Sequence, residues 1–142
     1  MIQYPIEFNS VTSAVHGVQN NWKTRSNNLV ADISIPPEFK GPGGGFSPED
    51  LFNQALANCF VATFKVYAEN SKLIFSDVVV DAKLVVDIDD SKKAMMKEFY
   101  LVAKIKSPSN PEKAILLAKK AAQSGLILNS VKTICHFEFH VV

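Results

Sequence analysis

The sequence predicts an α+β fold in which antiparallel sheets pack around one long central helix. Several short segments alternate apolar and polar residues, which is typical of half-buried β-strands. Residues 48–70 combine helix-start signals with apolar residues at helical spacing, and a second, shorter amphipathic pattern begins at Pro111. A chain of 142 residues with 47% hydrophobic content has the usual size and composition of one domain, so we expect residues 1–142 to form a single domain.

The charge and hydropathy patterns exclude several classes of protein. Fifteen Lys and Arg residues nearly balance 14 Asp and Glu residues, giving a net charge of +1. Because no basic block stands out, we expect no nucleic-acid partner. No segment approaches the roughly 20 apolar residues of a membrane span, and the N-terminus lacks a secretory signal pattern. These patterns predict a cytoplasmic protein without a membrane partner.

The first third of the chain predicts a small antiparallel meander followed by a glycine-rich loop. Apolar and β-branched residues gather at positions 2–8, 11–18 and 29–33, with Asn, Ser and Gly between them. Two prolines and then Gly41-Pro42-Gly43-Gly44-Gly45 follow, a composition that interrupts regular structure. The loop lacks the Lys-Ser/Thr pair of a phosphate-binding loop, so we interpret it as a flexible segment.

The helix predicted at residues 48–70 has a well-defined start. Ser47 is a good N-cap residue, Pro48 suits the first helical position, and Asp50 can complete a capping box. Apolar residues occupy most of its circumference, so most of its sides need cover. At 1.5 Å per residue the helix is about 34 Å long, which is difficult for a small monomer to cover. The sequence therefore predicts a homodimer.

The rest of the chain predicts two long strands, one amphipathic helix and a final strand. Alternating segments lie at residues 76–88 and 97–105, with a charged hairpin loop at 87–93. The amphipathic helix begins at Pro111 and ends at Gly125. A short helical piece is expected within residues 126–132, and residues 133–142 alternate as a strand.

Two cysteines and two histidines are the remaining candidates for chemistry. Cys59 lies within the long helix, and Cys135 lies in the last strand on the side of its phenylalanines. Two widely spaced thiols in a cytosolic chain are expected to be reduced, and Cys135 is interpreted as core filler. His136 and His140 lie on one strand face without an evident third ligand, so we expect no metal site and no cofactor.

Essentially the whole chain resembles the OsmC/Ohr family of thiol peroxidases, and the match is most specific in the middle. The matching motifs are Gly41-Pro42-Gly43-Gly44, then Ser47-Pro48-Glu49-Asp50-Leu51-Phe52, then Ala55-Leu56-Ala57-Asn58-Cys59-Phe60. The resemblance implies an intertwined homodimer with active sites at the subunit interface. It also implies that Cys59 attacks the peroxide bond, that an arginine favours its thiolate, and that Glu49 orients this arginine.

The sequence departs from the family pattern at two positions. Gly125 stands where the family has its second, resolving cysteine, and the turn at residues 16–23 has no arginine. Arg25 follows shortly afterwards and is the expected thiolate partner, with Lys23 or His16 as alternatives. Glu49 and Cys59 lie about 15 Å apart along the helix and roughly 80° apart around it. They therefore act together only across two subunits or through an intermediary.

Three functions remain open from the sequence. The first is a peroxide-defence enzyme that reduces organic hydroperoxides through Cys59, with an external thiol as resolver. The second is an inactive relative that binds a hydrophobic small molecule in an apolar interface pocket lined by Phe46, Phe52 and Phe60. The third is a structural or regulatory dimer without a small-molecule site.

Overall fold

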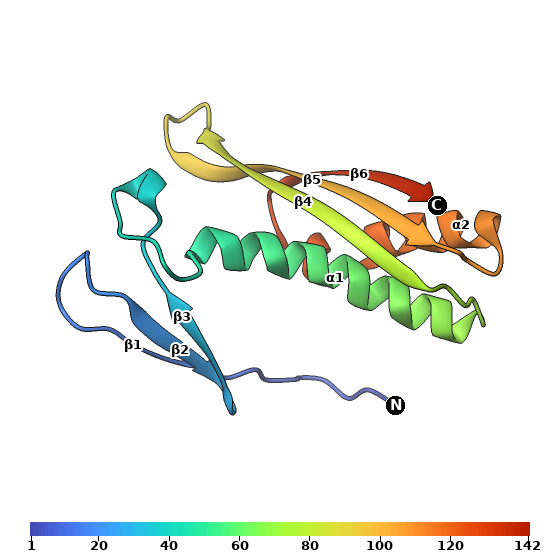
Figure 1. Ribbon diagram of the computed structural model, residues 1–142, viewed down its shortest axis with the longest axis horizontal. Coiled ribbons are helices and arrows are strands. Elements are labelled where there is room, and N and C mark those ends of the chain that lie inside the picture. The colour runs from blue at the N-terminus through green and yellow to red at the C-terminus, as the bar shows by residue number, and fades with distance from the viewer. The chain divides into compact units, whose positions relative to one another are not determined.

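The computed structural model describes all residues from Met1 to Val142 and divides into two compact units, Met1–Leu51 and Phe52–Val142 (Figure 1). The boundary falls near the start of the long helix α1, Pro48–Asn70. The expectation of a single domain stays a prediction. Two helices and two three-stranded sheets confirm the predicted α+β class. No helix combines the length and the apolar character needed to span a membrane.

The first unit contains an antiparallel meander in the order β1-β2-β3. Its strands are β1 (Val11–Ser13), β2 (Trp22–Ser26) and β3 (Leu29–Ile33). Asn27 has a positive φ of 55°, a conformation that asparagine tolerates in tight turns, and it closes the turn between β2 and β3.

Two of the predicted strands in this unit were wrong in extent or place. Residues 2–8 form no strand, and the segment predicted at 11–18 is a strand only over Val11–Ser13. The central strand β2 was not predicted, because its sequence Trp-Lys-Thr-Arg-Ser lacks an apolar run. Backbone pairing to both neighbours defines β2, and hydrophobic periodicity does not report such pairing.

The glycine-rich loop folds back against β3 because two of its residues have no side chain. A Cβ atom on Gly41 would meet the carbonyl oxygen of Ile35 at 1.9 Å, and one on Gly45 would meet that of Asp32 at 2.8 Å. The Ser34 hydroxyl donates to the Gly43 carbonyl at 2.9 Å, and Phe46 bridges to Ile33. The loop is thus held by backbone contacts that require glycine.

Helix α1 begins with the predicted capping box and has the predicted bounds. The backbone N–H of Asp50 donates to Ser47 Oγ at 2.9 Å, and the N–H of Ser47 donates to Asp50 Oδ2 at 3.0 Å. Two backbone donors that the first helical turn leaves unpaired are satisfied in this way. The carboxylates of Glu49 and Asp50 also lie at the positive end of the helix dipole.

The sheet of the second unit has the order β4-β5-β6 (Figure 1). Strands β4 (Asp77–Ile88) and β5 (Ala94–Lys106) form the predicted hairpin, and β6 (Ile134–Val141) pairs with β5. The β5–β6 pair is parallel, which corrects the expectation of purely antiparallel sheets. The helix α2 (Pro111–Ser124) lies between these strands in sequence and returns the chain to the end where β5 starts.

Helix α2 has the ends that the sequence predicts. The Asn110 side chain accepts from the N–H of Lys113 at 3.0 Å, and Gly125 follows the last helical residue. A 3-10 turn, Leu128–Ser130, then provides the short helical piece expected before β6. Along β6 the exposed and half-buried residues alternate, so Phe137 and Phe139 face the core as predicted.

The hydrophobic core of the second unit joins α1, α2 and β5. Phe60 is completely buried, and its ring stacks on those of Phe64 and Phe139 with centroids 6.0 and 5.7 Å away. Further buried residues come from all three elements: Leu56, Phe64 and Ala68; Phe99, Leu101, Ala103 and Ile105; Ala114, Leu117, Ala118 and Ala121. These contacts fix the helix face that carries Cys59.

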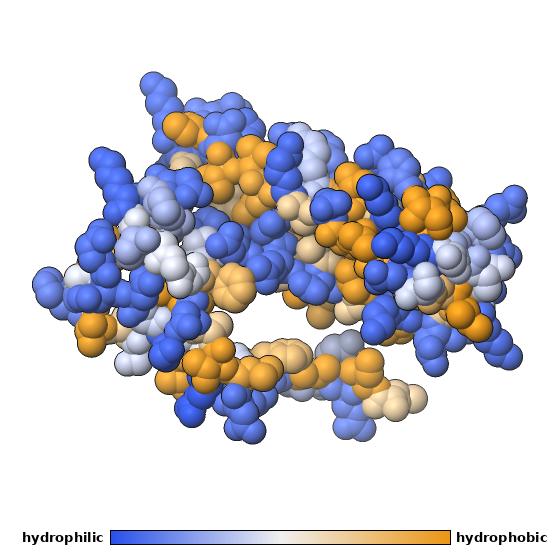
Figure 2. All heavy atoms as spheres, in the orientation of Figure 1, coloured by the Kyte–Doolittle hydropathy of each residue, from blue (hydrophilic) through white to orange (hydrophobic).

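Each unit leaves apolar side chains exposed. On α1, Val66 retains 56% exposure, so the chain covers only part of this mostly apolar helix. In the first unit, Ile2, Tyr4 and Phe8 are exposed, and Figure 2 shows apolar residues at the surface of this N-terminal segment. Apolar surface of this kind is typical of proteins that associate with another chain.

A polar cluster on the outer face of the second sheet links Glu98, Tyr100 and His136. The Tyr100 hydroxyl donates to Glu98 Oε2 at 3.0 Å, and His136 Nε2 lies 3.3 Å from Glu98 Oε1. The imidazole ring also stacks on the Tyr100 ring at 4.6 Å. The hydrogen bond from Tyr100, and after it that from His136, lowers the pKa of Glu98, and the same carboxylate raises the pKa of Tyr100.

Replacing Tyr100→Phe is therefore expected to raise the pKa of Glu98 towards the ordinary value of a carboxyl group. A lowered folded-state pKa stabilises the fold above the unfolded-state pKa, and this contribution is lost as pH falls through the folded-state pKa. The variant should therefore show a weaker loss of stability on acidification. NMR titration of the side-chain carboxyl carbons measures the pKa of Glu98. Asp89 is the internal control, because a hydrogen bond from Ser91, and not from Tyr100, lowers its pKa. An unchanged Glu98 titration contradicts the expectation.

Candidate functional site

Cys59 lies on the buried face of α1, next to the end of α2. Its side chain is only 9% exposed. A Cβ atom placed on Gly125 would lie 2.8 Å from Cys59 Sγ and 3.0 Å from Leu128 Cδ1. The Thr63 hydroxyl donates to the Cys59 carbonyl at 2.7 Å, a bond within the helix that leaves the thiol free. The Cys59 sulfur therefore packs directly against the Gly125 backbone.

This contact shows what changes when a glycine replaces the family's second cysteine at position 125. In a disulfide, the Cβ of one residue lies about 3 Å from the sulfur of the other, given the S–S bond length. The family resemblance places the second thiol at position 125. This position is therefore close enough to Cys59 for a disulfide bond, but in this chain it is a glycine. Within this chain, Cys59 has no resolving thiol at that position.

Cys135 has a different environment. It lies on β6 opposite Phe99, is half-buried, and its Sγ donates weakly to the Thr133 carbonyl at 3.5 Å. Burial raises the pKa of the Cys135 thiol, which disfavours the nucleophilic thiolate at neutral pH. This environment agrees with the interpretation of Cys135 as core filler.

Glu49 lies in the first turn of α1 and has an unsatisfied side-chain oxygen. Its Oε1 atom is buried and has no hydrogen-bond partner. Asn53, one turn later, is in the same state: Oδ1 is buried without a partner, while Nδ2 lies 3.4 Å from the Ala82 carbonyl. Sequence reasoning did not single out Asn53. Its spacing of four residues from Glu49 was the available signal.

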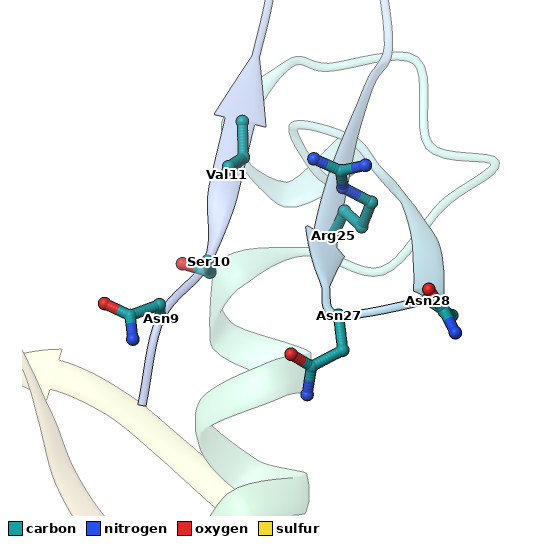
Figure 3. A pocket seen from close by; sticks show the side chains of 6 residues that line it. All are labelled: Asn9, Ser10, Val11, Arg25, Asn27 and Asn28. Atoms are coloured by element: carbon teal, nitrogen blue, oxygen red, sulfur yellow. The ribbon is translucent and has the colours of Figure 1, made fainter. Parts of the chain in front are cut away.

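Arg25 is the only arginine in the chain. It lies near the end of β2, where its cross-strand neighbours are Val11 and Val30, and its side chain takes part in no hydrogen bond or ion pair. A shallow hollow of about 330 Å³ surrounds it, and Figure 3 shows no acidic side chain among the residues that line it. Those residues are Asn9, Ser10, Val11, Arg25, Asn27 and Asn28.

Of the two alternative partners, Lys23 is already engaged in an ion pair. Lys23 Nζ already binds Asp32 Oδ1 at 2.5 Å. His16 is exposed at a turn, where its carbonyl accepts from Asn20 Nδ2 at 2.8 Å. A free guanidinium is therefore presented by Arg25, whereas the Lys23 ammonium is paired.

The three phenylalanines predicted to line an apolar pocket have different environments. Phe60 is completely buried in the core of the second unit, and Phe52 is half-buried against that core. Phe46 belongs to the first unit and is 43% exposed. Their joint role in a ligand pocket stays a prediction.

Comparison with known proteins gives the family context. The profile of OsmC-like proteins matches residues 41–140. An uncharacterized Bacillus subtilis protein, YmaD, is 29% identical over 111 residues, covering 75% of this chain and 74% of YmaD. Among solved structures, an OsmC-like protein of unknown function from Vibrio cholerae has a TM-score of 0.84 at 16% identity, covering 95% of this chain and 99% of that chain.

A second solved structure has a more specific description. It is an organic hydroperoxide resistance protein from Legionella pneumophila, described as an OsmC and a predicted redox protein, with a TM-score of 0.73 at 24% identity. The similarity covers 96% of this chain and 98% of that chain. The family profile includes both the helix that carries Cys59 and the position of Gly125. The chain therefore belongs to the family of OsmC-like proteins.

Proposed function

We propose that this protein reduces organic hydroperoxides through Cys59 and that an external thiol completes the cycle. The observation that carries the proposal is the contact between Cys59 Sγ and Gly125. A resolving cysteine would fit at position 125, but a glycine is there, so the resolving thiol has to come from outside the chain. Membership of the OsmC-like family and the similarity to an organic hydroperoxide resistance protein support the choice of substrate.

The proposed cycle balances with two external thiols. The Cys59 thiolate attacks one oxygen of the hydroperoxide, an S–O bond forms, and the O–O bond breaks. The leaving alkoxide takes a proton and departs as an alcohol, and Cys59 becomes a sulfenic acid. The first external thiol attacks the sulfenic sulfur, releasing water and giving a mixed disulfide. A second thiol then attacks this disulfide, releases the external disulfide and restores the Cys59 thiol.

Arg25 and Glu49 have the properties that the proposed thiolate site needs. A cation beside the sulfur favours the thiolate, which is the reactive form. Arg25 has an uncommitted guanidinium, and Glu49 has a buried oxygen that lacks a donor. Because Glu49 lies about 15 Å from Cys59 along the axis of α1, we assign the two residues of one site to different protomers of a homodimer.

The exposed apolar surface supports the proposed homodimer, and the need for a small thiol supports a cytoplasmic location. The exposed apolar side chains of α1 and of the N-terminal segment offer the surface that a homodimer buries. Small thiols are kept reduced in the cytoplasm, so the proposed reductant is available there, and we place the protein in that compartment.

The first test is the rate at which Cys59 is oxidised by cumene hydroperoxide and by hydrogen peroxide, with trapping of the sulfenic acid. We expect cumene hydroperoxide to oxidise Cys59 on the order of 10²-fold faster than it oxidises a free thiol, the effect of one well-placed electrostatic group. Cys59→Ser should abolish the reaction, and Cys135→Ser should leave it unchanged. Turnover should then require only a small thiol reductant.

The opposite result is equally informative. Oxidation of Cys59 at the rate of a free thiol would contradict the proposed enzyme. Loss of turnover in Cys135→Ser, with sulfenic acid still formed, would contradict resolution by an external thiol.

A further inference from the structure

Two buried acceptors on α1 lack donors, Glu49 Oε1 and Asn53 Oδ1. A buried acceptor without a hydrogen bond costs about 1–3 kcal/mol, so such atoms are rare in folded proteins. Their presence on neighbouring turns of one helix indicates that a donor group belongs beside them.

Regular helix geometry places the two acceptors side by side. Residues four apart on an α-helix share one face, with Cβ atoms about 5–6 Å apart. The contact of Asn53 Nδ2 with the Ala82 carbonyl, at 3.4 Å, sets the orientation of the amide and leaves Oδ1 as the unpaired atom. One carboxylate oxygen and one amide oxygen are thus offered to a common donor.

A guanidinium group suits this pair better than an ammonium group. Its N–H donors lie in a rigid planar fork, so a single arginine can donate to two separate acceptors at once. The chain has a single arginine, Arg25, and its side chain has no hydrogen bond or ion pair of its own. The donors of Arg25 can therefore satisfy the two unpaired acceptors and leave further N–H groups free.

We propose that Asn53 is a positioning residue that shares the guanidinium of Arg25 with Glu49 in the homodimer. This inference rests on the function proposed above and adds a residue to its site. A hydrogen bond to one carboxylate oxygen alone, here Glu49 Oε1, leaves a guanidinium free to rotate about that bond. A second, neutral acceptor fixes its plane without adding negative charge, which would oppose formation of the Cys59 thiolate. Asn53 thereby keeps the remaining N–H groups directed at the sulfur.

The test compares Asn53→Ala with Asn58→Ala as matched control. Asn58 is an asparagine on the same helix whose Nδ2 donates to the Gln54 carbonyl. Asn53→Ala should slow Cys59 oxidation by cumene hydroperoxide about tenfold, the loss expected for one hydrogen bond to a charged group. It should also move the pH midpoint of Cys59 alkylation upwards. Asn53→Asp keeps an acceptor but adds a negative charge and loses the donor to the Ala82 carbonyl, so it should not restore the pH midpoint of Cys59 alkylation.

A double-mutant cycle with Arg25→Ala identifies the partner. If Asn53 acts through Arg25, Asn53→Ala in the Arg25→Ala background should slow oxidation no further. The same cycle is measured by thermal unfolding, where coupling of the two residues should appear as a non-additive shift of about 3 °C.

The rate of Cys59 oxidation and the coupling in thermal unfolding together separate this inference from the proposed function. Fast oxidation of wild-type Cys59 together with additive effects of the two substitutions would overturn the role of Asn53 and leave the enzyme intact. Slow oxidation of wild-type Cys59 together with clear coupling in thermal unfolding would contradict the enzyme and support the shared guanidinium.

Discussion

Gly125→Cys is expected to form a disulfide with Cys59 under mild oxidation. The ideal Cβ position at residue 125 lies 2.8 Å from Cys59 Sγ, close to the corresponding distance of about 3 Å in a disulfide. Gly125 has φ −63° and ψ 129°, which any residue adopts without strain. The bond needs only a small adjustment of the Cys59 side chain.

The oxidised variant should be markedly more stable than the reduced one. Closing the long loop between positions 59 and 125 restricts the unfolded chain, which contributes about 4 kcal/mol in the chain-entropy model. The reduced variant should be less stable than the wild type, because the new Cβ also meets Leu128 Cδ1 at 3.0 Å. In peroxide assays, the thiol introduced at position 125 should attack the sulfenic acid of Cys59. The disulfide should therefore form without an external thiol.

Thiol titration, peptide mapping without reductant, and thermal unfolding with and without dithiothreitol measure these effects. Gly125→Ala is the control, because it adds the Cβ atom without the sulfur. Gly125→Cys combined with Cys59→Ser should form no intramolecular disulfide. A bond between the introduced thiol and Cys135, or free thiols at both positions 59 and 125 after oxidation, would show that these two positions are not in contact.

Phe60→Ala is expected to destabilise the fold by about 3–5 kcal/mol, the range for removing a fully buried aromatic ring. Phe60 has no exposed surface, and its ring stacks on both Phe64 of the same helix and Phe139 of β6. Truncation therefore opens a cavity between α1 and the sheet. Such a loss is a large fraction of the total stability of a typical domain, about 5–15 kcal/mol.

Urea denaturation followed by circular dichroism measures the change in free energy of unfolding. Leu116→Ala is the control, because this leucine on α2 is 66% exposed and its loss should change stability by less than about 0.5 kcal/mol. Equal effects of the two substitutions would show that Phe60 is not in the core. That outcome would favour the alternative in which Phe60 lines a ligand pocket.

The best predictions from the sequence concern features that neighbouring residues specify. The start of α1 and its capping box depend on Ser47, Pro48 and Asp50, which lie within one turn of one another. The end of α2 at Gly125 and the inward face of β6 likewise follow from local chemistry and alternation. In such segments the local preference agrees with the global fold.

The wrong predictions concern features that distant partners decide. Strand β2 is polar, and it is a strand because both β1 and β3 pair with its backbone. The parallel pairing of β6 with β5 depends on the path of the chain through α2. Hydrophobic periodicity reports which face of a segment is buried, but it does not report which strand lies beside it or in which direction.

The candidate site shows the same division. By itself, the sequence determined the family resemblance, the helix that carries Cys59, and the replacement of the second cysteine by Gly125. Only the tertiary structure decided that Gly125 touches the Cys59 sulfur, that Lys23 is already paired, and that Asn53 and Glu49 hold unsatisfied oxygens. The physical reason is that motifs arise from residues adjacent in sequence. Packing and hydrogen-bond satisfaction depend on side chains that meet only after the chain has folded.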